Sequence, residues 1–135
     1  MKKIISLLLA VVFLLSAQPV YAENNSITPY YIYIDQTSDD FEVNTKTGVA
    51  TVDADIMVEN NLYCRVVAKV QRKINNSWVN FRTFYDADYG FAYITETTSL
   101  TKGYSYRCVF TYYVYNANNV IIEEENITSP IIDYR

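Results

Sequence analysis

Few residues of this 135-residue chain are of the types that do chemistry in enzymes, since it contains no histidine and two cysteines. Without histidine it cannot form a Ser-His-Asp triad, a Cys-His dyad or a metal site with a histidine ligand. Carboxylates are the remaining candidates. Asp53 and Asp55 are two residues apart, which on a β-strand places them on one face, about 6–7 Å apart. This separation is compatible with a glycosidase carboxylate pair, and ordinary polar alternation along a strand explains it equally well.

A second acidic group, Asp86, Asp88 and Gly90, has some similarity to a calcium-binding loop. The EF-hand order requires glycine at position six and a bidentate glutamate at position twelve. Here glycine is at position five, and position twelve is Thr97. We therefore expect a plain loop between strands and no metal site. We also expect no cofactor and no catalytic residue. A small carboxylate-dependent hydrolase is therefore only the third hypothesis for function.

The charge of the chain argues against two classes of partner. Its formal net charge is −4, from 11 basic and 15 acidic residues. A protein that binds nucleic acid or anionic lipid through electrostatics carries a marked basic excess or a basic face. We therefore expect neither of these partners.

The first 22 residues are typical of a secretory signal peptide. A positively charged start, residues 1–3, precedes an apolar run over residues 4–15, and Val20 and Ala22 suit signal peptidase. The apolar run is short for a membrane span. We therefore expect cleavage after Ala22, secretion out of the cell, and a mature protein without a membrane span.

The remaining residues are enough for one domain with a single core. Residues 23–29 are expected to form a flexible N-terminal arm, and the domain itself to cover residues 30–135. From residue 30 onward, polar and apolar residues alternate with period two, and helical periodicity is absent. The clearest case is residues 49–58, where one face of the expected strand carries Ala50, Val52, Ala54, Ile56 and Val58.

Short polar turns divide the domain into seven or eight strands, which predicts an all-β, antiparallel β-sandwich. Asn75 and Asn76 favour a tight hairpin, because asparagine tolerates positive φ. Residues 36–40 and 86–90 are expected to interrupt the strands. A short apolar pair, Phe41 and Val43, follows the first break. The strands are expected over residues 30–35, 49–58, 62–74, 78–85, 91–98, 104–115 and 120–123, with residues 127–134 continuing at the edge.

Two stretches resemble motifs of secreted bacterial immunoglobulin-like and fibronectin-III-like modules. Residues 70–79 are similar to their Leu-Gln-Arg…Gly-x-Trp hairpin, and residues 100–106 to the Leu-x-Pro-Gly-x-x-Tyr sequence that leads into strand F. Residues 27–31, Ile-Thr-Pro-Tyr-Tyr, are similar to the start of small secreted Firmicutes proteins of unknown function. The resemblance implies an immunoglobulin-like or fibronectin-III-like sandwich, in which Tyr106 is the tyrosine corner and Trp78 has a structural role.

Cys64 and Cys108 are an even pair of thiols in a chain expected to be secreted, which favours one disulfide. With Trp78 and Tyr106 they resemble the immunoglobulin Cys…Trp…Tyr-x-Cys pattern. In the expected strand order both cysteines lie in one sheet, whereas the immunoglobulin disulfide joins two sheets. The alternative is two buried free thiols that pack as small apolar groups. We predict the disulfide.

The 14 tyrosines are the most unusual feature of the composition. Tyr106 and Tyr112 are expected in the core, and Tyr104 near a turn. Tyrosine supplies contact area at low entropic cost and is enriched in binding surfaces, although it is also a good strand former that fills half-buried positions. The expected outer face of one sheet is therefore the candidate ligand-binding surface, and it carries Tyr63, Arg65, Lys69, Tyr113 and Tyr115.

The leading hypothesis is a secreted, non-enzymatic binding or adhesion module that recognises a protein or glycan at or near the cell surface, with a monomer favoured. Residues 30–34 are rich in strand formers and carry no charge. As an exposed edge, such a segment can template self-association. A self-assembling structural protein that pairs through this edge strand is the alternative.

Overall fold

A computed structural model describes residues 31–135 and has an all-β fold in that range. The expected signal peptide and N-terminal arm, and all but the last residue of the 27–31 motif, lie outside the described residues. Eight strands and one 3₁₀ turn follow each other along the chain: β1 (Ile34–Asn44), β2 (Val49–Val58), η1 (Glu59–Asn61), β3 (Tyr63–Ile74), β4 (Ser77–Tyr89), β5 (Phe91–Ser99), β6 (Tyr104–Tyr115), β7 (Ile121–Thr128) and β8 (Ile132–Tyr134).

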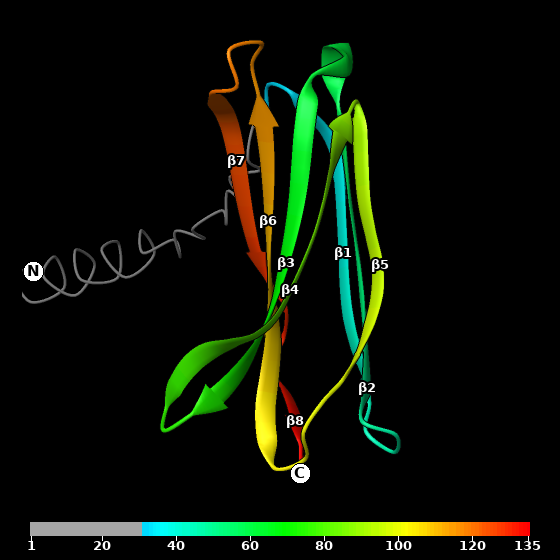
Figure 1. Cartoon of the computed structure of the whole chain (residues 1–135), viewed down its shortest axis with the longest axis vertical. Helices are drawn as coiled ribbons and strands as arrows, with labels where there is room; N and C mark the ends of the chain where they lie inside the picture. Colours follow the sequence, from blue (N-terminus) through cyan, green and yellow to red (C-terminus); the bar gives the residue numbers. More distant parts are fainter. Residues whose placement is uncertain (1–30) are drawn as a thin grey trace, which may run out of the picture.

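The strands form two antiparallel sheets that face each other, a β-sandwich arrangement (Figure 1). One sheet has the order β1-β2-β5. The other has the order β4-β3-β6-β7, and β8 pairs with the far end of β6. The hairpin of β3 and β4 curls away from the sandwich at the end opposite η1 (Figure 1). At its tip, Asn75 and Asn76 have φ of 48° and 63°, which confirms the predicted hairpin at these two residues.

The core forms because each sheet turns one apolar face towards the other. All five alternating residues predicted on one face of residues 49–58 are buried, and so are the alternating Cys64, Val66, Ala68 and Val70 of β3. β6 contributes the large aromatic side chains. Tyr106, Phe110 and Tyr112 are fully buried among the smaller residues of β2 and β3.

The hydroxyl of Tyr106 bonds the backbone upstream of its strand. The Tyr106 hydroxyl donates to the carbonyl oxygen of Thr101 at 2.8 Å and accepts from the Thr101 N–H at 3.0 Å. These two bonds hold the turn between β5 and β6. The buried hydroxyl of Tyr112 donates to the carbonyl oxygen of Ser38 at 2.7 Å, which ties β6 of one sheet to β1 of the other.

The start of the domain differs from the prediction. Residues 36–40 do not interrupt a strand, because β1 runs without a break from Ile34 to Asn44. Its polar residues are those of a sheet edge, since β1 pairs only with β2. Within the described residues strand structure begins at Ile34, so residues 31–33 are not in the strand that was predicted there. The backbone N–H groups of Ile32, Tyr33 and Ile34 donate to the Glu123 carboxylate at 2.8, 2.8 and 3.0 Å.

The segment from Asp86 to Gly90 also differs from the prediction. β4 continues to Tyr89, with Asp86 opposite Val66 and Asp88 opposite Cys64 on β3. Only Gly90, at φ +79°, turns the chain into β5. The polar residues of this segment lie on an edge strand, where one side is free of pairing, so composition alone made a strand look like a loop.

The predicted disulfide is wrong. Cys64 and Cys108 lie on the paired strands β3 and β6, but Cys64 is opposite Val114 and Cys108 is opposite Val70. Six residues of strand therefore separate them, about 20 Å, whereas a disulfide needs Cα atoms within about 7 Å. Both are free thiols with no exposed surface. Burial raises the pKa of Cys64 to about 11 and that of Cys108 to about 12.

Candidate functional site

The outer face of the five-stranded sheet brings the predicted binding residues together. On β3, Tyr63, Arg65 and Lys69 alternate with the buried residues and so point away from the core. Tyr63 is opposite Tyr115 on β6, and Arg65 is opposite Tyr113. Four of the five residues thus occupy two adjacent rows. Lys69 lies on the same face, four residues further along β3, about 13 Å from Arg65.

The tyrosines of this face pack against each other. The Tyr63 ring lies 5.6 Å from the Tyr115 ring, and the Tyr115 ring lies 6.3 Å from that of Tyr113, measured between centroids. All three are half-buried by this mutual contact and no further layer covers them in the described part of the chain. Such packing fixes the rings before any ligand binds, which lowers the entropic cost of binding.

Two residues of the face were missed by the sequence analysis. Tyr89 is opposite Tyr63 on β4, with ring centroids 5.2 Å apart in an edge-to-face arrangement. Tyr85 is two rows further along, and the Arg65 guanidinium lies 4.9 Å from its ring centroid. They are 64% and 67% exposed. Both were assigned to or beside a loop, so the signal that could have found them is the alternation of Tyr85, Ala87 and Tyr89. The tyrosine face is defined here as Tyr63, Tyr85, Tyr89, Tyr113, Tyr115 and Arg65.

A shallow hollow of about 480 Å³ lies at one end of the tyrosine face. Tyr63, Tyr89 and Tyr115 form its floor. Its rim combines amide side chains from η1 and from the turn between β6 and β7, namely Asn61, Asn116 and Asn119, with Leu62 and Ala117. Asn61 and Asn119 have positive φ values of 51° and 59°, a conformation that asparagine adopts readily in tight turns. The hollow thus offers aromatic rings beside hydrogen-bonding amides.

The other end of the same face is basic. Lys69, Lys73 and Arg107 point outwards there, and the Arg107 guanidinium lies 4.4 Å from the Trp78 ring centroid. Arg107 also donates from Nε to the Gln71 side chain at 2.8 Å. Trp78 is therefore half-buried beneath charged groups at the start of β4, outside the core. Within residues 31–135, none of these three basic residues lies within 4.0 Å of a carboxylate.

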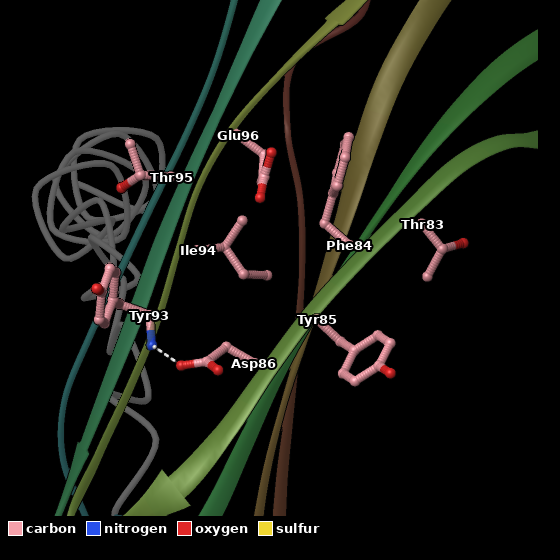
Figure 2. Close-up of a pocket in the computed structure, with 8 residues that line it drawn as sticks. All are labelled: Thr83, Phe84, Tyr85, Asp86, Tyr93, Ile94, Thr95 and Glu96. Carbon is pink, nitrogen blue, oxygen red and sulfur yellow. Dashed lines mark hydrogen bonds between the residues drawn. The ribbon is translucent and has the colours of Figure 1, made fainter.

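A second hollow, of about 530 Å³, lies between the edge strands β4 and β5, where the two sheets separate. Figure 2 shows the residues that line it, with Tyr85 and Tyr93 pointing in opposite directions. The Asp86 carboxylate accepts a hydrogen bond from the Tyr93 N–H at 2.9 Å and so links β4 to β5. Asp86 is thereby engaged in holding the two edges together.

The three-stranded sheet presents an acidic outer face. Asp53 and Asp55 both lie on it, as their alternation predicts, and the Ser38 hydroxyl donates to Asp55. Asp53 is opposite Asp40 on β1. A shallow hollow of about 400 Å³ beside β5 includes both Asp53 and Asp55. In the described part of the chain, no group of three or more histidine, cysteine or acidic residues could hold a metal ion.

Comparison with known proteins adds no assignment. No protein-family model matches the chain, no curated protein is similar to it, and no solved structure matches its fold. Among residues 31–135, no helix is long and apolar enough to cross a membrane. The function is therefore argued from the two outer faces themselves.

Proposed function

We propose that this protein is a secreted, non-enzymatic binding module of the immunoglobulin or fibronectin-III kind, whose tyrosine face recognises a protein or glycan at or near the cell surface. The strand order supports the fold assignment. β1, β2 and β5 share one sheet while β3, β6 and β7 share the other, as strands A, B, E and C, F, G do in immunoglobulin-type domains. The bonds between Tyr106 and Thr101, at the start of β6, correspond to a tyrosine corner.

The observation that carries the proposal is the contiguous cluster of five tyrosines on one face, which no other layer covers within residues 31–135. Three strands supply them, and centroid distances of 5.2–6.3 Å join four of them into one aromatic surface. An aromatic surface that is already ordered gains binding energy from burial without the entropic cost of ordering long side chains. Its hydroxyl groups, and the amides at the rim of the hollow, provide hydrogen bonds to a polar ligand.

The second part of the proposal, the absence of catalysis, is supported by the lack of histidine in the sequence. It is also supported by the place of the carboxylates. Asp53 and Asp55 lie on the sheet opposite to the tyrosine face, and Asp86 bonds a backbone N–H. Neither group converges with the aromatic hollow in which a ligand would be held.

A cell-wall binding assay tests the proposal. Purified Firmicutes cell walls are incubated with the protein before and after protease treatment, which separates a protein ligand from a glycan ligand. The double variant Tyr63→Ser/Tyr115→Ser removes the floor of the hollow, and its bound fraction should fall at least about tenfold, since several aromatic contacts of about 1 kcal/mol each are lost. Equal binding by the variant would contradict the proposal.

The matched control is Tyr93→Ser, which removes an exposed tyrosine from the other sheet. This variant should bind the walls like the wild-type protein. Cooperative urea unfolding of all three proteins checks that the folds are intact. If Tyr93→Ser lost binding while Tyr63→Ser/Tyr115→Ser kept it, the binding face would be the acidic one.

A further inference from the structure

The two outer faces of the sandwich carry opposite charges. On β3, β4 and β6 the outward positions carry four basic residues and no acidic one, and the neighbouring β7 and β8 add Glu124 and Asp133 to the same face, which leaves it with an excess of basic residues. On β1, β2 and β5 the outward positions carry four acidic residues and no basic one. The basic residues are Arg65, Lys69, Lys73 and Arg107, and the acidic residues are Asp40, Glu42, Asp53 and Asp55.

The carboxylates of the acidic face repel each other in the isolated molecule. Asp40 and Asp53 are directly opposite each other on β1 and β2, and like charges in that position destabilise a sheet. Within residues 31–135, neither has a basic group within 4.0 Å. A cationic partner would relieve the repulsion, and the other face carries four cations that have no carboxylate within 4.0 Å among residues 31–135.

Each outer face also has an apolar end, and both apolar ends lie beside η1. On the acidic face, Met57, Phe91 and Tyr93 are 42%, 43% and 59% exposed, and the rings of Phe91 and Tyr93 stack with centroids 5.8 Å apart. On the basic face, Tyr63 begins β3 directly after η1. Because η1 joins the end of β2 to the start of β3, the two aromatic groups lie at the same end of the sandwich (Figure 1).

We infer that one partner of the tyrosine face is the acidic face of a second copy of this chain. Two copies in the same orientation, stacked sheet on sheet, place aromatic residues on aromatic residues at the η1 end. They then place Arg65 and Lys69 over the row of Asp53 and Asp55. This inference rests on the proposed function, because it names a protein partner for the same face.

The geometry of this contact does not limit the number of copies in the assembly. The two copies use different faces, so the contact is heterologous and each copy keeps one free face of each kind. Stacks can therefore grow by adding copies. A ligand bound to the tyrosine face would end a stack, since it occupies the surface that the next copy needs.

The contact is expected to be weak and to depend on salt. Exposed ion pairs contribute little in water, and the net charge of −4 makes whole molecules repel each other. Sedimentation velocity measures the association of the purified protein. Concentrations of about 10 μM to 1 mM cover contacts with micromolar to millimolar dissociation constants. At about 0.02 M salt the mean mass should rise with concentration, and at about 0.5 M salt it should return to the monomer mass. A monomer at every concentration in low salt would overturn the inference.

Charge reversal on one face at a time identifies the contact. Lys69→Glu/Lys73→Glu removes the net positive charge of the tyrosine-bearing outer face, and Asp40→Lys/Asp53→Lys removes the net negative charge of the acidic face. Each variant alone should remain monomeric. An equimolar mixture should form pairs that do not grow into stacks, because the intact acidic face of the first variant matches the intact tyrosine face of the second, while the two altered faces no longer attract a partner. General attraction does not explain such a result, since the first pair of substitutions lowers the net charge of −4 by four units and the second raises it by four, so the two proteins are not oppositely charged.

The matched control is Lys46→Glu/Lys102→Glu, which makes the same change in net charge at two exposed lysines in turns. It should assemble like the wild-type protein. A mixture of the two charge-reversed variants that stays monomeric would overturn the inference. The wild-type protein separates the two proposals. If it binds cell walls but stays monomeric at low salt, only the second copy as partner is refuted, whereas unchanged wall binding by Tyr63→Ser/Tyr115→Ser refutes the proposed function. The acidic-face variant keeps the tyrosine face, so it should bind walls while it remains monomeric.

Discussion

The two sheets contribute different side chains to the core that they share. The three-stranded sheet supplies mainly small and aliphatic residues, such as Ala50, Ala54 and Ile94, together with the ring of Phe41, whereas β6 of the five-stranded sheet supplies Phe110 and two buried tyrosines. The outer faces differ too, since one is acidic and the other combines tyrosine with basic residues. The five-stranded sheet therefore holds most of the packing volume and the candidate site, and the three-stranded sheet covers its inner face.

The largest expected change in stability comes from shortening one core side chain in each sheet. Phe110→Ala should lower the free energy of unfolding by about 3–5 kcal/mol, because it leaves a cavity where a fully buried ring fills the space between the sheets. Ile94→Val in the three-stranded sheet should cost about 0.5–1.5 kcal/mol. Urea unfolding followed by tryptophan fluorescence measures both. Since Phe110→Ala removes many more buried atoms than Ile94→Val, a loss for Phe110→Ala as small as that for Ile94→Val would mean that the ring does not fill the space between the sheets.

Removal of single hydroxyl groups gives the next largest effect. Tyr106→Phe removes the donor to the Thr101 carbonyl and the acceptor for the Thr101 N–H, which should cost about 2 kcal/mol. Tyr112→Phe breaks one bond between the sheets and should cost about 1 kcal/mol. Tyr113→Phe on the outer face is the control, with little change expected. A large loss for Tyr113→Phe would show that the outer tyrosines serve stability more than binding.

The sequence predicts most of the inner faces because burial imposes a regular pattern. Residues 49–58 alternate without exception, and their predicted face is the buried one. The pattern is weaker at sheet edges, where one side of the strand meets water. For this reason residues 36–40 and 86–90 were predicted as breaks although β1 and β4 run through them.

Register between strands is the second quantity that the sequence leaves open. Cys64 and Cys108 were placed correctly on the apolar faces of adjacent strands, yet the pairing offsets them by six residues. The same limit explains the candidate site. Tyr63, Tyr113 and Tyr115 were found from their phase on β3 and β6, whereas Tyr89 was missed because its strand was cut short at residue 85. The face on which a side chain lies follows from the alternation along its own strand, whereas its neighbours depend on how the strands pair.

The buried thiols make the five-stranded sheet sensitive to alkali. Burial raises the pKa of Cys64 to about 11 and that of Cys108 to about 12, from an ordinary value of 9.0. The folded state therefore keeps both protons while the unfolded chain releases them, so the stability is intact below pH 9 and declines as the pH rises towards 11 and 12. At pH 10 the loss should be about 1 kcal/mol for each thiol.

Urea unfolding at pH 8 and pH 10 measures this loss. The variant Cys64→Ala/Cys108→Ala has a smaller free energy of unfolding at both values, but its change between them should be smaller than in the wild-type protein. The variant retains the buried Tyr112, whose pKa burial also raises, so a part of the alkaline response should remain. Identical changes in both proteins would mean that the thiols ionise equally in the folded and unfolded states.

The smallest expected change in stability comes from removing one charge on each outer face. Asp40→Asn removes one member of the Asp40–Asp53 pair on the acidic face, which should raise the free energy of unfolding by a few tenths of a kcal/mol in low salt. Lys69→Gln, opposite Thr83 and Val109 on the other sheet, relieves no comparable like-charge pair and should change little. Because salt screens exposed charges, the gain from Asp40→Asn should disappear at about 0.5 M salt. A gain that persists in high salt would have a cause other than repulsion, and the acidic face would then have no electrostatic need for a cationic partner.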